Sequence, residues 1–290
     1  MGGIIDKITE FIKELLQGWV LTNFEIMFTD VNDKVGTIAG EVSKTPSTWN
    51  SGIFDMIKTL SDNVMIPIAG MIISFVLVYE LISMVIDKNN LHDFNTAIFI
   101  RFFMKACIAV MLLSKTFDIV MAVFDVGSHI VNSAASAITG STSIDVASTL
   151  QTMFNEQFSE MSIGELLGLG METMIVSLCM KIMSVLITVI LYGRMIEIYL
   201  YVSVAPVPCA TVTNREWGTI GTNYFKGLCA LAFQGFFMMV CVAIYAVLVA
   251  GVAVSDNLHT ALWSVAAYTV ILCFSLFKTG SLSKSIWNAH

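Results

Sequence analysis

The ionisable residues inside the apolar stretches of this sequence are few, and they are the first candidates for chemistry. Lys181 lies about a third of the way into the apolar stretch 173–203, with no acidic residue within one helical turn. A charge inside a membrane span costs roughly 2.5–3.5 kcal/mol on insertion scales, so such a residue faces protein or water rather than lipid. One Lys181 per subunit of an oligomer would form a charged ring, which is a way of building ion selectivity.

Three further charges lie near the ends of apolar stretches. Arg101 and Lys105 are four residues apart, and Glu80 lies one to two turns before the end of its stretch. Long side chains reach the polar headgroups from such positions, which explains all three residues. A positively charged pore mouth is the alternative for the two cations. A pair between Glu80 and Lys181 is also open, although it would join opposite depths.

Residue types that carry catalysis or bind metals form no recognisable pattern. The sequence has no paired-carboxylate motif in an apolar stretch, no Ser–His or Cys–His spacing, no glycine-rich phosphate loop and no H-E-x-x-H motif. Its four histidines are far apart, and its six cysteines form no C-x-x-C pair. We therefore predict no enzyme, no catalytic residue, no cofactor and no metal site.

Composition identifies the environment of the chain. Of its 290 residues, 56% are hydrophobic and 13% are charged, and the mean hydropathy is +0.80. Soluble domains carry roughly 25% charged residues, and a chain this apolar needs a lipid-facing surface. The net charge is −7, and no basic cluster offers stable binding to nucleic acid.

Apolar stretches of about 20 residues are long enough to cross the hydrocarbon core of a bilayer. The sequence predicts an all-α, polytopic membrane protein with about five transmembrane helices. The stretches are 64–86, 96–114, 173–203, 227–254 and 260–277.

The predicted N-terminal segment, residues 1–62, is extracytoplasmic or interfacial. Residues 4–19 form an amphipathic helix with Phe11, Leu15 and Trp19 on its apolar face. This face lies on a membrane surface, docks on a partner helix or covers the protein's own core. Turn formers such as Asn32-Asp33, Gly36 and Gly40 predict only short helices after residue 20.

The rest of the chain divides at its spans. Residues 63–114 form a transmembrane hairpin, 115–172 an acidic, helical extracytoplasmic loop, and 173–290 a three-span domain with a cytoplasmic elbow at 194–226. Within the loop, Ser162 and Glu165 have capping-box spacing and are expected to open the helix of the third span.

Two prolines indicate where the elbow begins. Pro206 and Pro208 stop the preceding helix, because proline lacks an amide donor and restricts the residue before it. Arg215 and Trp217 follow in a stretch that is a rigid elbow, a re-entrant piece or a simple turn. Arg194 and Glu197, three residues apart, are expected to form an ion pair.

Lysine and arginine collect in cytoplasmic loops. The connections after the first and third spans and the C-terminal tail contain cations, whereas the 115–172 loop is acidic. This distribution predicts a multi-pass protein of the cytoplasmic membrane with its N-terminus outside and its C-terminus inside.

The stretch from Val204 to Val240 resembles the TrbL/VirB-type polytopic inner-membrane subunits of conjugative type IV secretion systems, most closely those of Gram-positive conjugative elements. The resemblance rests on the A-P-x-P turn at 205–208, the N-R-E-W-G run at 214–218 and F-Q-G-F at 233–236. It implies a channel or scaffold subunit that forms a homo-oligomeric ring in the lipid bilayer. Other secretion-system subunits would be the partners of this ring. Single-stranded DNA with its relaxase would pass transiently, and the acidic loop disfavours stable nucleic-acid binding.

Three alternatives belong to other classes. A stand-alone small-solute transporter or ion channel would show broken helices and paired ionisable groups near the midplane. A membrane enzyme would need clustered catalytic groups at one interface. A toxin-like or holin-like pore would lyse cells on expression.

Overall fold

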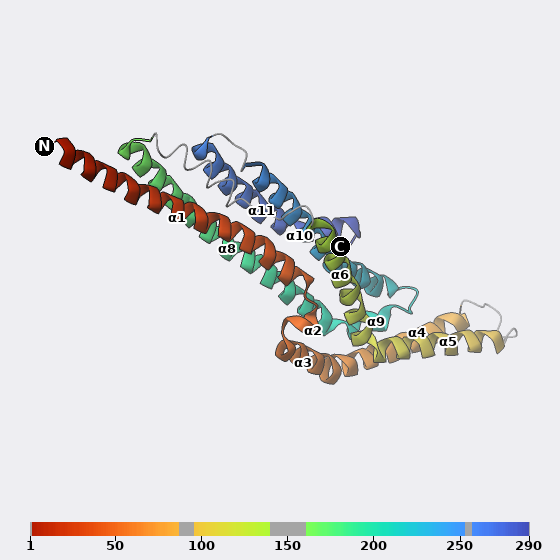
Figure 1. Ribbon diagram of the computed structural model, residues 1–290. Helices are drawn as coiled ribbons and strands as arrows, with labels where there is room; N and C mark the ends of the chain where they lie inside the picture. The colour runs from red at the N-terminus through yellow and green to blue at the C-terminus, as the bar shows by residue number, and fades with distance from the viewer. Residues whose placement is uncertain (1, 87–95, 140–160, 253–256, 290) are drawn as a thin grey trace. The chain divides into compact units, whose positions relative to one another are not determined.

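The computed structural model describes residues 2–86, 96–139, 161–252 and 257–289, and every regular element in these ranges is helical (Figure 1). The all-α prediction is confirmed for this part of the chain. Part of the predicted 115–172 loop, residues 140–160, lies outside these ranges. The elements are α1 Gly2–Ser43, α2 Pro46–Trp49, α3 Ser51–Leu60, the π-helical turn η1 Ser61–Met65, α4 Ile66–Ile86, α5 Thr96–Ser114, α6 Thr116–Thr139, α8 Ile163–Val204, α9 Pro206–Thr211, α10 Gly218–Val252 and α11 Leu258–Ile286.

Five helical stretches of the described chain are long and apolar enough to cross a membrane, which confirms the predicted number. They are Ser51–Ile86, Thr116–Ala137, Ile163–Val204, Gly218–Val252 and Leu258–Ile286. Four of them contain spans that the sequence predicts. The fifth, within α6, lies in the stretch predicted as an external loop.

The exposed faces of α5 and α6 differ in character. α6 exposes Asp118, Asp125 and His129, so its outer face is polar although its average composition is apolar. α5 exposes mainly large apolar side chains, among them Phe103 and Met111. Lipid suits the face of α5 better, and the choice of α5 as the second span stays a prediction.

The chain forms two compact units, and each is described by itself. The first consists of Met1–Val42, Val131–Leu191 and Phe236–Thr279, and the second of Ser43–Ile130, Tyr192–Gly235 and Gly280–His290. The long helices α8, α10 and α11 contribute residues to both units.

In the first unit, α1 and α8 run side by side in the same direction (Figure 1). The buried residues of α1 recur every three or four positions, and those of α8 do so except for one seven-residue step between Met180 and Ile187, as in a coiled-coil seam. Asn23 donates a hydrogen bond to the Thr173 hydroxyl over 3.2 Å, and Lys34 donates one to the Met180 carbonyl over 3.2 Å. The seam consists of Val20, Phe24, Met27, Val31, Lys34, Ile38 and Val42 on α1, and of Leu166, Leu169, Thr173, Val176, Met180, Ile187 and Leu191 on α8.

The expectation of turns between residues 32 and 40 is wrong, because α1 is one helix to Ser43. A glycine inside a helix costs roughly 1 kcal/mol relative to alanine, whereas burying one large apolar side chain contributes about 1.5–3 kcal/mol. The seam residues Val31, Ile38 and Val42 are almost fully buried, so packing outweighs the local preference. Gly36 and Gly40 lie on the opposite, open face of the helix.

In the second unit, α9 packs on α4 and α5, and the Ala69, Ile73, Ala109, Leu113 and Ala210 side chains form their common core. A separate core joins α3, the start of α6, the end of α8 and the start of α10, and it includes Phe124, Tyr199 and Leu228. The Tyr199 hydroxyl donates a hydrogen bond to the Pro46 carbonyl over 2.7 Å. This bond fixes α2 beside the end of α8.

Candidate functional site

Lys181 is exposed on α8, and within the described residues no hydrogen bond or ion pair joins it. Polar residues precede and follow it at helical spacing: Ser177, Ser184 and Thr188 lie four before, three after and seven after it. They form a polar stripe along an edge of a helix whose remaining exposed face is apolar. The stripe was not predicted, although its spacing is visible in the sequence.

Glu80 of α4 accepts an ion-paired hydrogen bond from the Lys105 ammonium of α5 over 2.6 Å. The side chain of Glu80 is 10% exposed and that of Lys105 is 45% exposed. The sequence predicts that each of these side chains reaches the headgroups separately, and this ion pair was not predicted. A predicted hairpin places both residues at related depths, so opposite charges on its two arms were the available signal. Arg101 is exposed on the same helix as Lys105.

The predicted helix stop at the two prolines is confirmed. α8 ends at Val204, and Pro206 and Pro208 lie buried in the short helix α9. The chain then turns at Asn214, whose side-chain oxygen accepts hydrogen bonds from the backbone amides of Glu216 and Trp217, both over 2.8 Å. This side chain therefore satisfies amides that a turn leaves without partners.

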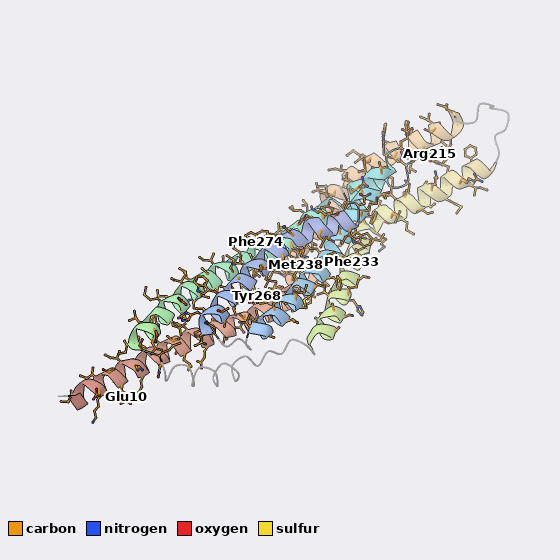
Figure 2. The ribbon with its side chains drawn as sticks, turned by 90° about the horizontal axis from the view of Figure 1, so that it is seen from above. Glu10, Arg215, Phe233, Met238, Tyr268 and Phe274 are labelled. Atoms are coloured by element: carbon orange, nitrogen blue, oxygen red, sulfur yellow. The ribbon has the colours of Figure 1, made fainter. Side chains whose placement is uncertain are left out.

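Residues of the N-R-E-W-G run pack the elbow against α4. The Trp217 ring stacks on Phe75 and Tyr79, with ring centroids 5.5 and 5.6 Å apart. The Tyr79 hydroxyl donates a hydrogen bond to Glu216 over 2.8 Å. Arg215 projects from the same turn and is exposed (Figure 2). These contacts pack the turn against α4, and its role as a rigid elbow stays a prediction.

Close backbone approach explains two glycines of the elbow. A Cβ on Gly221 would lie 2.3 Å from a methyl group of Val212 and 2.6 Å from the Pro208 carbonyl oxygen. A Cβ on Gly218 would lie 3.1 Å from the Val212 carbonyl oxygen. α10 thus packs against the elbow only because these positions lack side chains. Burial at the same place raises the pKa of the Cys209 thiol to about 11.

The prediction of an ion pair between Arg194 and Glu197 is wrong, because Glu197 has a different partner. Glu197 pairs with Lys284 of α11 over 2.8 Å. The Arg194 side chain is buried, and its Nε atom has no hydrogen-bond partner among the described residues. Lys284 lies 87 positions along the chain from Glu197, so local spacing gave no sign of it.

The apolar face of the N-terminal helix is exposed. Phe11, Leu15 and Trp19 are 62%, 59% and 39% exposed. Trp19 also touches α8, because a Cβ on Gly170 would meet its ring. What covers the rest of this face stays a prediction.

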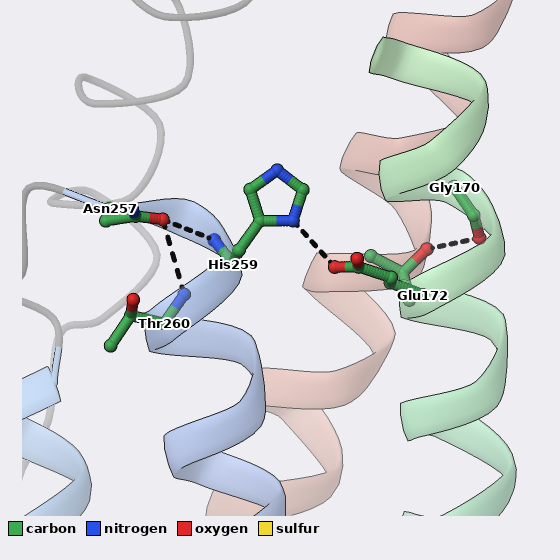
Figure 3. Close-up of polar contacts among 6 residues, drawn as sticks. Gly170, Glu172, Asn257, His259 and Thr260 are labelled. Carbon is green, nitrogen blue, oxygen red and sulfur yellow. Dashed lines mark hydrogen bonds and ion pairs between the residues drawn. The ribbon is translucent and has the colours of Figure 1, made fainter. Parts of the chain in front are cut away.

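One polar pair of the first unit was missed because its members are far apart in sequence. His259 of α11 and Glu172 of α8 lie 2.7 Å apart, and Asn257 caps α11 by accepting from the amides of His259 and Thr260 (Figure 3). The pair is partly exposed. Across the described ranges, no three His, Cys, Asp or Glu residues gather as a metal site requires.

The apolar spans, the isolated Lys181 within residues 173–193 of α8 and the ion pair of the α4–α5 hairpin define a multi-pass α-helical membrane protein. The family model described as TrbL/VirB6 plasmid conjugal transfer like protein matches residues 31–206, which is more than half of the chain. The chain therefore belongs to this family, whose printed description connects it with plasmid conjugal transfer. The comparisons with curated proteins and with solved structures gave no match.

The family prediction is confirmed, but by a different part of the chain. The matched residues end at 206, where the stretch from Val204 to Val240 has barely begun. Most of the three motifs quoted from the sequence therefore lie outside the match. Their structural roles at the elbow stand on the contacts described above.

Proposed function

We propose that this protein is a membrane-embedded channel or scaffold subunit of a conjugative type IV secretion apparatus of the Gram-positive type, assembled as a homo-oligomeric ring with other subunits. The family match over residues 31–206 carries this proposal. The protein acts as a structural component of the export machinery and not as an enzyme.

The exposed surface supports a role among several neighbours. Apolar side chains cover the outer face of α8, among them Met174, Ile182, Val189 and Leu200, each more than half exposed. Such faces need lipid or protein around them. A ring in a bilayer supplies both.

The orientation belongs to the same proposal. The N-terminus lies outside and the C-terminus lies in the cytoplasm, because cations gather at the elbow and in the tail. Single-stranded DNA with its relaxase would pass without being held, since the chain is acidic overall and phosphate is repelled by carboxylates.

Deletion of the gene from a donor cell tests the proposal. We expect conjugative transfer to fall to background and to return when the wild-type protein is supplied in trans. Native mass spectrometry of the purified protein in nanodiscs is expected to show a closed oligomer. Normal transfer without the gene, or a monomer alone, would contradict the subunit role or the ring, respectively.

A further inference from the structure

The charges of α8 mark the depth at which this helix crosses the bilayer. Between Glu172 and Arg194 the only charged residue is Lys181. The intervening stretch, 173–193, is about 30 Å long at 1.5 Å per residue, which is the thickness of a hydrocarbon core. Its exposed face consists of large apolar residues such as Ile182 and Val185.

α1 accompanies α8 over this whole stretch. At one end, Asn23 bonds to Thr173 over 3.2 Å. At the other end, a cavity of about 90 Å³ between the two helices is lined by residues that include Ile38 and Leu191. Residues 23–42 of α1 therefore lie at the depth of the membrane span of α8.

The composition of α1 at this depth is opposite to that of α8. Five charged residues fall between residues 23 and 42, whereas α8 carries one over the matching stretch. The outer face of α1, away from its seam, is polar or lacks side chains at nearly every exposed position. The charged residues are Glu25, Asp30, Asp33, Lys34 and Glu41, and the exposed outer face consists of Thr22, Glu25, Ile26, Thr29, Asp33, Gly36, Thr37 and Gly40.

The free-energy cost of burying charge in hydrocarbon excludes lipid as the neighbour of this face. An ionised carboxylate is costly to place in hydrocarbon, and the small residues between the carboxylates recover little apolar contact. The polar stripe of α8, including Lys181 and Thr188, borders the same groove, since Ser184 and Thr188 line the cavity together with Asp30 and Asp33. The two helices thus present one continuous polar surface.

We propose that the outer face of α1 and the polar stripe of α8 together form a water-exposed, net-acidic surface at membrane depth. The four carboxylates Glu25, Asp30, Asp33 and Glu41 outnumber the two cations of this surface, exposed Lys181 and buried Lys34, which lines the same cavity. Such a surface admits cations and repels phosphate. Its use as a wall of the export passage rests on the proposed function.

Cysteine labelling in native membranes tests the surface. Thr29→Cys, Thr37→Cys and Thr188→Cys place a small thiol on the polar surface. Val185→Cys and the native Cys179 place one on the exposed face of α8 that we assign to lipid. The full-length variants are treated with a charged, membrane-impermeant methanethiosulfonate, and each site is read by peptide mass spectrometry.

We expect the three threonine positions to react at least about tenfold faster than Val185→Cys and Cys179, because thiolate forms in water and not in hydrocarbon. Equal, slow labelling at all five positions would overturn the proposal. The conjugation frequency of treated donor cells tests whether this surface lines the export passage. Transfer should fall for Thr29→Cys and not for Val185→Cys. Fast labelling without loss of transfer would leave a wet surface and remove its link to the passage.

Discussion

The pair formed by Glu80 and Lys105 is asymmetric in burial, and this asymmetry determines what each residue contributes. Glu80 is nearly buried, whereas Lys105 is almost half exposed. Among the described residues, Glu80 has no other ion-pair partner to replace Lys105, whereas a half-exposed ammonium reaches headgroups or water through its flexible stem.

We therefore expect Lys105→Met to lower the stability of the protein in detergent by about 1–3 kcal/mol. Glu80→Gln should cost less, and Glu80→Met combined with Lys105→Met should recover most of the loss, because no uncompensated charge stays buried. Thermal unfolding of the three variants checks this order. Equal losses for the two single variants would show that the burial of Glu80 is irrelevant.

The raised pKa of Cys209 has consequences at alkaline pH. Its neutral thiol is favoured by burial, so the stability that it contributes is present below about pH 9, the ordinary value, and is lost as the pH rises towards 11. We expect Cys209→Ala to reduce the fall in melting temperature between pH 8 and pH 10.5. Cys179→Ala, at an exposed cysteine of α8, is the comparison. An identical pH profile for wild type and Cys209→Ala would contradict this account.

Single residues could be predicted from the sequence where a local rule acts, and not where the partner is distant. The capping box is confirmed, because the Ser162 hydroxyl and the Glu165 carboxylate exchange bonds with each other's backbone amides. Glu197 instead pairs with Lys284, which helical spacing could not reveal. Three- and four-residue intervals identify the buried face of a helix, but they do not identify the partner residue on another helix.

At the scale of elements, the elbow depends on the approach of α10 to α9. We expect Gly221→Ala to destabilise the protein by about 1–3 kcal/mol, because its Cβ meets a backbone carbonyl that cannot move away. Gly193→Ala is the matched control: nothing lies within 4 Å of its Cβ, so helix propensity should stabilise by up to about 1 kcal/mol. Differential scanning fluorimetry in one detergent compares both, and a neutral Gly221→Ala would remove the close-packing argument.

The elements themselves could be predicted where hydropathy is decisive. The spans of α8, α10 and α11 follow from their apolar length alone. The continuation of α1 beyond residue 20 could not be predicted, because its seam residues are spread among Asn, Asp and Gly that favour turns in isolation. Recurrence of apolar residues from Val20 to Val42 was the available signal, and the local preferences hid it.

For the whole molecule, the decisive contact is the hydrogen bond from the Tyr199 hydroxyl to the Pro46 carbonyl over 2.7 Å. Tyr199 lies near the end of α8 that the sequence predicts as cytoplasmic, whereas residues 1–62 are predicted as extracytoplasmic. Both predictions cannot hold for Pro46. If α1 crosses the membrane in the same direction as α8, its N-terminus lies outside and Pro46 lies on the cytoplasmic side.

This topology makes Ser47→Cys informative, because Ser47 is exposed in the short helix that carries Pro46. In intact cells we expect an impermeant thiol reagent to leave this position unlabelled, and permeabilised cells to label it. Ser281→Cys near the C-terminus should behave in the same way, since it lies on the side assigned to the cytoplasm. Labelling of Ser47→Cys from outside, with Ser281→Cys protected, would restore the external N-terminal segment. It would also exclude a crossing α1 and with it the water-exposed surface.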